Sequence, residues 1–102
     1  MHYILFYRLV EDYLERRTQF REAHLERIRQ AYDRGELVLA GALADPADGA
    51  VLVFHGSSPE AAEAFAQADP YVFHGLVKTW EVRKWNVVIG DGISLPSAGG
   101  KR

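Results

Sequence analysis

The chain has no cysteine among its 102 residues, and its net charge is only -2. Without cysteine it forms no disulfide and no thiol-based active site, so a reducing cytoplasm is the expected compartment. The charge balance lacks the basic excess that nucleic-acid binding requires. The first residues carry no basic leader, and their apolar run is too short for a signal sequence or a membrane span. We therefore expect a cytoplasmic protein that contacts neither nucleic acid nor membrane.

Sequence motifs for cofactors are also missing. The four histidines do not fall into a metal-ligand spacing, because no H-x-H, H-E-x-x-H or Cys/His cluster occurs. Glycine-rich phosphate loops and the G-x-S-x-G elbow of serine hydrolases are absent. We expect neither a metal nor an organic cofactor.

The pattern that is present predicts one α+β domain. Runs of aromatic and branched residues indicate strands, and apolar residues that recur every 3.6 positions indicate helices. The elements follow in the order strand, helix, strand, strand, helix, strand, at residues 3–9, 12–34, 37–43, 51–54, 58–68 and 77–88. This order predicts the split βαββαβ, or ferredoxin-like, unit over residues 1–89. The glycine- and serine-rich segment 90–102 is expected to be a mobile tail.

Capping residues mark the ends of the predicted helices. Gly35 suits the C-cap of the first helix, because glycine readily adopts the left-handed conformation found there. The second helix has two alternative starts: Ser58 before a proline at the first helical position, or a capping box of Ser57 with Glu60. The sequence leaves both open.

The first predicted strand is apolar on both faces. In an antiparallel sheet one face normally meets water and carries polar residues. Here one face carries Tyr3, Leu5, Tyr7 and Leu9, and the other carries Ile4 and Phe6. Two helices cover only one face of such a sheet, so we expect a second copy of the chain to cover the other. The predicted assembly is a homodimer.

His24 is the first candidate for chemistry. It shares the apolar stripe of the first predicted helix with Phe20, Ile28 and Ala31. A histidine on a rigid helix, in apolar surroundings, suits proton transfer near neutral pH. The alternative is a core or interface histidine whose ring nitrogens are satisfied by neighbours. The sequence does not decide between them.

Asp69 is the candidate partner of His24. A carboxylate on one ring nitrogen would fix the tautomer of the imidazole and leave the other nitrogen free for substrate. The ordinary role of an aspartate before Pro70 is a helix N-cap. If the site transfers protons, His24 and Asp69 must lie within hydrogen-bond distance in a concave pocket.

Three further residues are assigned as substrate contacts. Tyr71 offers a hydroxyl to the same cavity, or only a packing ring. Arg8 either extends to the surface or holds an anionic ligand. His74 stands outside any metal-ligand pattern and is the third contact. The arginines of the first predicted helix alternate with carboxylates, which predicts a solvated face.

Three segments make the chain resemble the YciI-like proteins of the dimeric α+β barrel superfamily. They are L-E-R-R-x-x-x-R-E-A-H-L-E-R-I from Leu14, D-R-G-E-L-V-L-A-G from Asp33 and S-P-E-A-A-E-A-F-A-Q-A-D-P-Y from Ser58. The resemblance covers residues 2–88. It implies a ferredoxin-like protomer, a homodimer whose two sheets close a barrel, and a cleft that holds a His-Asp catalytic pair.

The resemblance carries the catalytic pair onto His24 and Asp69 by position. Related superfamily members isomerise lactones or oxidise ring compounds without a metal or organic cofactor. The chain departs from the family at Ala42, where a proline is usual, and at Ala50, where a serine is common. If that serine binds substrate in relatives, this chain lacks a polar contact and takes a different ligand.

Three hypotheses for function follow. The leading one is a cofactor-independent isomerase or lyase that moves protons on a cyclic or unsaturated small molecule, with His24 as base and Asp69 as its orienting partner. The second is a small-ligand-binding or sensory dimer that uses the same cleft without turnover. The third is a structural dimer in which His24 packs and Asp69 caps a helix. The sequence does not name the substrate.

Overall fold

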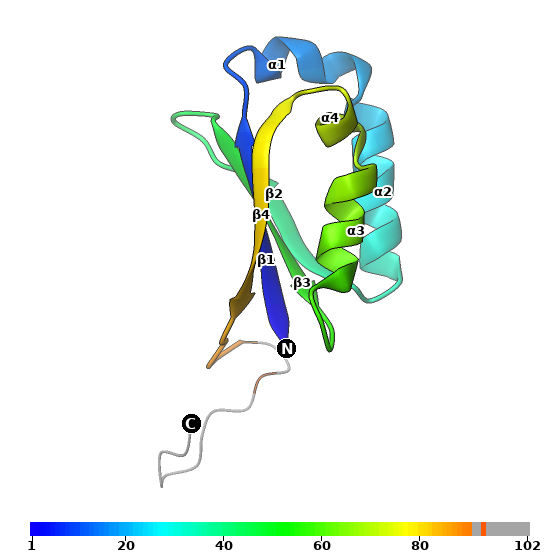
Figure 1. Ribbon diagram of the computed structural model, residues 1–102, viewed down its shortest axis with the longest axis vertical. Helices are drawn as coiled ribbons and strands as arrows, with labels where there is room; N and C mark the ends of the chain where they lie inside the picture. The colour runs from blue at the N-terminus through cyan, green and yellow to red at the C-terminus, as the bar shows by residue number, and fades with distance from the viewer. Residues whose placement is uncertain (91–92, 94–102) are drawn as a thin grey trace, which may run out of the picture.

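The computed structural model describes residues 1–90 and 93, so most of the predicted tail lies outside the described residues. Four strands form one antiparallel sheet in the order β2-β3-β1-β4. Their bounds are β1 His2–Leu9, β2 Leu37–Ala42, β3 Gly49–His55 and β4 Val77–Trp85. The long helices, α2 (Arg21–Asp33) and α3 (Glu60–Ala68), lie on one side of the sheet (Figure 1). The predicted α+β, ferredoxin-like fold is confirmed.

The core lies between the sheet and these two helices, with β1 at its centre. Alternate side chains of β1 are buried in this core, namely those of Tyr3, Leu5, Tyr7 and Leu9. Leu52 and Phe54 of β3 and Phe65 of α3 pack in the same cluster. Burial of these apolar surfaces is the main favourable contribution to folding. None of the helices within residues 1–90 has the length and apolar character needed to span a bilayer.

The single helix predicted over 12–34 is wrong. In its place the structure has a short helix, a 3-10 turn and a long helix, with bounds α1 Tyr13–Arg16, η1 Arg17–Gln19 and α2 Arg21–Asp33. The apolar spacing gives no sign of the break at Phe20, which has a tertiary cause. A straight helix over 12–34 would be about 35 Å long, whereas the eight-residue β1 spans about 26 Å. The break instead brings the ring of Tyr13 to 5.7 Å from that of Tyr71.

Two other boundaries are explained by local contacts. The last strand ends at Trp85 and not at Val88, because Trp85 lies opposite His2, the first residue of β1, with which it pairs among the described residues. At the start of α3 the Ser58 hydroxyl accepts a hydrogen bond from the Glu60 amide at 3.3 Å. The helix itself begins at Glu60, with Pro59 as its N-cap residue and no side-chain cap, so neither predicted start is the one observed.

Candidate functional site

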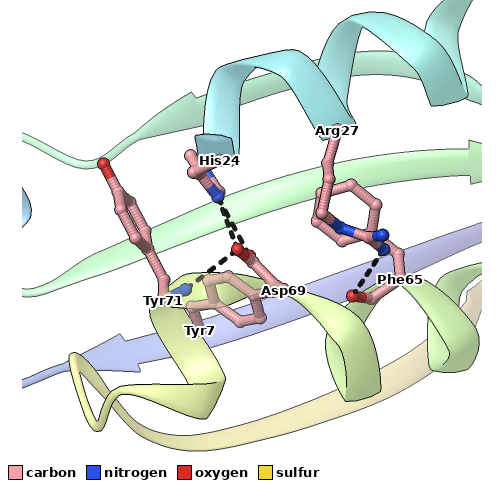
Figure 2. Close-up of polar contacts among 6 residues, drawn as sticks. All are labelled: Tyr7, His24, Arg27, Phe65, Asp69 and Tyr71. Atoms are coloured by element: carbon pink, nitrogen blue, oxygen red, sulfur yellow. Dashed lines mark hydrogen bonds and ion pairs between the residues drawn. The ribbon is translucent and has the colours of Figure 1, made fainter. Parts of the chain in front are cut away.

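His24 on α2 and Asp69, directly after α3, form a buried hydrogen-bonded pair (Figure 2). The His24 Nδ1 atom lies 2.8 Å from Oδ1 and 3.0 Å from Oδ2 of Asp69. Asp69 is fully buried, and His24 is 9% exposed. The predicted proximity of the two side chains is confirmed. A carboxylate can only accept a hydrogen bond, so Nδ1 carries the hydrogen and Nε2 is the basic nitrogen of the neutral ring.

Asp69 has two other hydrogen-bond donors. The Tyr7 hydroxyl donates to Oδ2 at 2.6 Å, and the Tyr71 amide donates to Oδ1 at 3.0 Å. The second bond is an N-cap, because Asp69 immediately precedes the short helix α4 (Pro70–Phe73). One carboxylate is thus both the N-cap of α4 and the partner of His24, two roles that the sequence analysis gave as alternatives. Three donors stabilise its negative charge in a buried position.

Tyr7 is the member of this network that the sequence reasoning missed. It lies on the core face of β1 and is 3% exposed. Burial, together with the adjacent Asp69 carboxylate, raises the pKa of Tyr7 far above its ordinary value. The phenol therefore stays protonated and donates at every physiological pH. The one signal in the sequence was a hydroxyl on the buried face of a strand, which needs a partner somewhere in the fold.

A cavity of about 280 Å³ lies against the pair. Its lining includes His24, Tyr7 and Tyr71, together with apolar side chains of α2, β2 and β3. The His24 ring stacks on the Tyr71 ring, with centroids 3.8 Å apart and planes 9° from parallel. Asp69 stands behind the histidine and does not line the cavity. The arrangement presents an imidazole of fixed orientation to a partly open cavity.

The structure brings some predicted site residues together and leaves others apart. Tyr71 lines the cavity with His24, whereas Arg8 and His74 do not. Arg8 is exposed on the other face of β1, because successive strand residues point to opposite sides. The exposed His74 stacks its ring on Phe20, with centroids 4.2 Å apart. This placement gives no support to substrate contacts at Arg8 and His74.

Arg17, which is half-buried, and Arg21, which is exposed as its sequence context predicted, also line the cavity. The break at Phe20 changes the direction of the chain between them, and no periodicity in the sequence marks that break. Ala42 and Ala50, the two departures from the family pattern, line the same cavity. They place methyl groups where a proline and a serine are usual.

Within residues 1–90 and 93, no three His, Cys, Asp or Glu side chains gather in a way that would hold a metal ion. The expectation that the protein works without a metal or organic cofactor stays a prediction.

Comparisons with known proteins agree with this fold. The YCII-related domain family matches residues 1–86. Two proteins called Protein YciI, from Escherichia coli O6:H1 and Shigella flexneri, are each 36% identical over 97 residues, covering 86% of this chain and 99% of theirs.

Two solved structures share the fold at lower identity. One is 5-chloro-2-hydroxyhydroquinone dehydrochlorinase from Burkholderia phenoliruptrix AC1100, in complex with 2,5-dihydroxybenzoquinone. It has a TM-score of 0.72 and 18% identity, covering 92% of this chain and 100% of that one. A protein from Agrobacterium tumefaciens has a TM-score of 0.51 and 23% identity, covering 81% of this chain and 89% of its own.

Proposed function

The chain belongs to the YCII-related family, and from that premise we propose that it is a small-molecule enzyme in which His24 transfers protons. The observation that carries the proposal is the imidazole itself, bound at Nδ1 by the Asp69 carboxylate and facing a cavity. General acid–base catalysis needs a group of this kind, with a suitable pKa and a fixed position. The dehydrochlorinase with the same fold supports the broader statement that the chain is an enzyme.

The proposed step transfers one proton and needs no outside oxidant or reductant. Nε2 of His24 takes a proton from a carbon or oxygen of the substrate, and the Asp69 carboxylate stabilises the imidazolium that forms. The imidazolium then returns the proton to a second substrate atom, which is an isomerisation. If a leaving group departs with its electron pair instead, the proton goes to solvent, and the reaction is an elimination.

The dehydrochlorinase supplies the first compound to test. Incubation of the protein with 5-chloro-2-hydroxyhydroquinone is expected to release chloride faster than the buffer does. Exchange of the ring hydrogens of 2,5-dihydroxybenzoquinone in D2O, followed by proton NMR, measures proton transfer to carbon separately. Acceleration of either reaction supports the enzyme. Saturable binding of these compounds in the cavity with neither reaction accelerated would contradict it and favour a binding or sensory module.

We also propose that the protein is a homodimer whose protomers meet through the sheet face away from the helices. Residues directly opposite on neighbouring strands share a face. The registers place Leu39, Val53 and Ile4 in one row, and Val51 and Phe6 in the next. Leu39 is 70% exposed and Phe6 36% exposed. A row of apolar side chains across three strands is a typical contact surface between subunits.

Light scattering at micromolar concentration is expected to give about 23 kDa, twice the protomer mass of 11.5 kDa. Phe6→Glu should shift this value toward the protomer, because it buries a charge between the subunits. Phe73→Glu is the matched control, since Phe73 is 76% exposed on α4, on the helical side of the sheet. A wild-type mass near 11.5 kDa would contradict the dimer proposal.

A further inference from the structure

We infer that Arg17, Arg21 and the Tyr71 hydroxyl form a subsite for the carboxylate of a single-ring substrate. The inference rests on the proposed function, because it places a ligand in the same cavity as His24. It adds the chemical class of that ligand.

The Tyr71 hydroxyl is the first observation. Tyr71 lines the cavity and is 2% exposed, yet its hydroxyl has no hydrogen-bond partner among the described residues. The side chain is held from two directions, by its own amide bound to Asp69 and by its ring stacked on His24. Figure 2 shows the hydroxyl directed away from the Asp69 carboxylate. A buried hydroxyl without a partner is costly, and an oxygen of a bound ligand would satisfy it.

The second observation is the state of the arginines. Arg16, Arg29 and Arg34 pair with carboxylates at the surface. Arg17 and Arg21, which line the cavity, have no carboxylate within 4.0 Å among the described residues. Arg8, Arg27 and Arg83 also lack such a carboxylate among the described residues, but they lie outside the cavity lining. Both arginines that do line the cavity are therefore free to bind an anionic ligand there.

Both arginines act on the same phenol. Burial, followed by the charge and the nearby hydroxyl of Tyr13, raises the pKa of Tyr71 to about 12, and the charges of Arg21 and Arg17 oppose that rise. The Tyr13 hydroxyl does not form a hydrogen bond with that of Tyr71, so the Tyr71 hydroxyl can still bind a ligand. Arg17 also lies over the Tyr13 ring, with its guanidinium carbon 5.6 Å from the ring centroid. Two arginines and the tyrosine thus line the same cavity.

These donors select the chemistry of the ligand. A guanidinium presents two parallel N–H groups that match the two oxygens of a carboxylate. The cavity of about 280 Å³ has room for one substituted ring, since an apolar cavity of about 150 Å³ already holds benzene. On α2, Arg21 and His24 are three positions apart, a rise of about 4.5 Å. If the carboxylate of a ring compound binds Arg21, the opposite edge of its ring therefore lies near His24.

The test uses three acids and the neutral amides that match them in shape: benzoate with benzamide, 4-hydroxybenzoate with 4-hydroxybenzamide, and nicotinate with nicotinamide. Titration of isotope-labelled protein by NMR measures each affinity and locates it through the arginine and tyrosine side-chain signals. We expect at least one acid to bind about tenfold or more tightly than its amide, as loss of a charge-assisted hydrogen bond predicts. The signals that move should include that of Tyr71.

Variants assign the preference to the subsite. The double variant Arg17→Gln, Arg21→Gln should bind acid and amide alike, and Tyr71→Phe should weaken the acid more than the amide. Arg29→Gln is the matched control, because Arg29 is an exposed arginine of the same helix that does not line this cavity. It should keep the full preference. The dispersion of the backbone amide signals verifies that each variant is folded.

Equal affinity for acid and amide in every pair would overturn the subsite, and so would a preference that the double variant keeps. Failure of all six compounds to bind up to their solubility limits would overturn it as well. None of these readouts requires turnover. A failed subsite therefore leaves the proton-transfer proposal to be judged by its own assay, and a failed enzyme assay leaves the carboxylate preference measurable.

Discussion

His24→Ala is expected to lower the rate of any reaction catalysed in the cavity by about a hundred- to ten-thousandfold, the usual contribution of a general acid or base. Among the side chains that line the cavity, the imidazole is the chemical group suited to both taking and giving a proton. Chloride release and ring-hydrogen exchange measure the loss directly.

Two further variants separate this chemical loss from a packing effect. His24→Gln retains a donor for the buried carboxylate but has no titratable ring, so it should be as inactive as the alanine variant and more stable. His55→Ala changes a histidine that is exposed at the end of β3 and lies outside the cavity lining. Its activity should equal that of the wild type. Retention of more than half of the activity in both His24 variants would exclude the histidine as the proton-transfer group.

Asp69→Ala is expected to have the largest effect on stability, lowering the free energy of unfolding by about 3–5 kcal/mol. The substitution removes one acceptor from three donors at once: Nδ1 of His24, the Tyr7 hydroxyl and the Tyr71 amide. Buried donors left without partners have lost their hydrogen bonds to water, and no hydrogen bond within the protein replaces them. Urea unfolding monitored by circular dichroism measures the change.

A graded series tests this explanation. Tyr7→Phe removes a single hydrogen bond and should cost about 1 kcal/mol. Asp69→Asn keeps the shape and one acceptor oxygen, so its loss of stability should fall between those of the other two variants, and the protein should stay folded. The same variant removes the orienting charge and should be inactive. If Asp69→Ala were no less stable than Tyr7→Phe, the carboxylate would not be the organiser of the three donors.

The fold was largely predictable because its signals are local. The two-faced apolar pattern of β1 and the strand order followed from residue types over a few positions. The break at Phe20 was not predictable, because the apolar spacing is that of one continuous helix. The break accompanies a contact between Tyr13 and Tyr71, and no short stretch of sequence records a contact between residues so far apart.

The site was predictable only where the family resemblance supplied a position. The pairing of His24 with Asp69 came from matched motifs, since a separation of 45 residues says nothing about distance. Tyr7, Arg17 and Arg21 reach the cavity through packing between elements remote in sequence. Their residue types agree equally well with a core tyrosine and two surface arginines, so only the folded chain distinguishes them.

The central position of β1 has a consequence for how the chain folds during synthesis. Its first residue, His2, pairs with both His55 and Trp85, so β1 is completed on its two sides at very different times. Once β3 has been made, β1 is one edge of a three-stranded sheet, and it keeps that apolar unpaired edge until β4 arrives. Such edges recruit other chains. Closure by β4 joins residues separated by almost the whole described chain, which makes it a slow step. The nascent protein is thus most prone to aggregate just before its last strand docks.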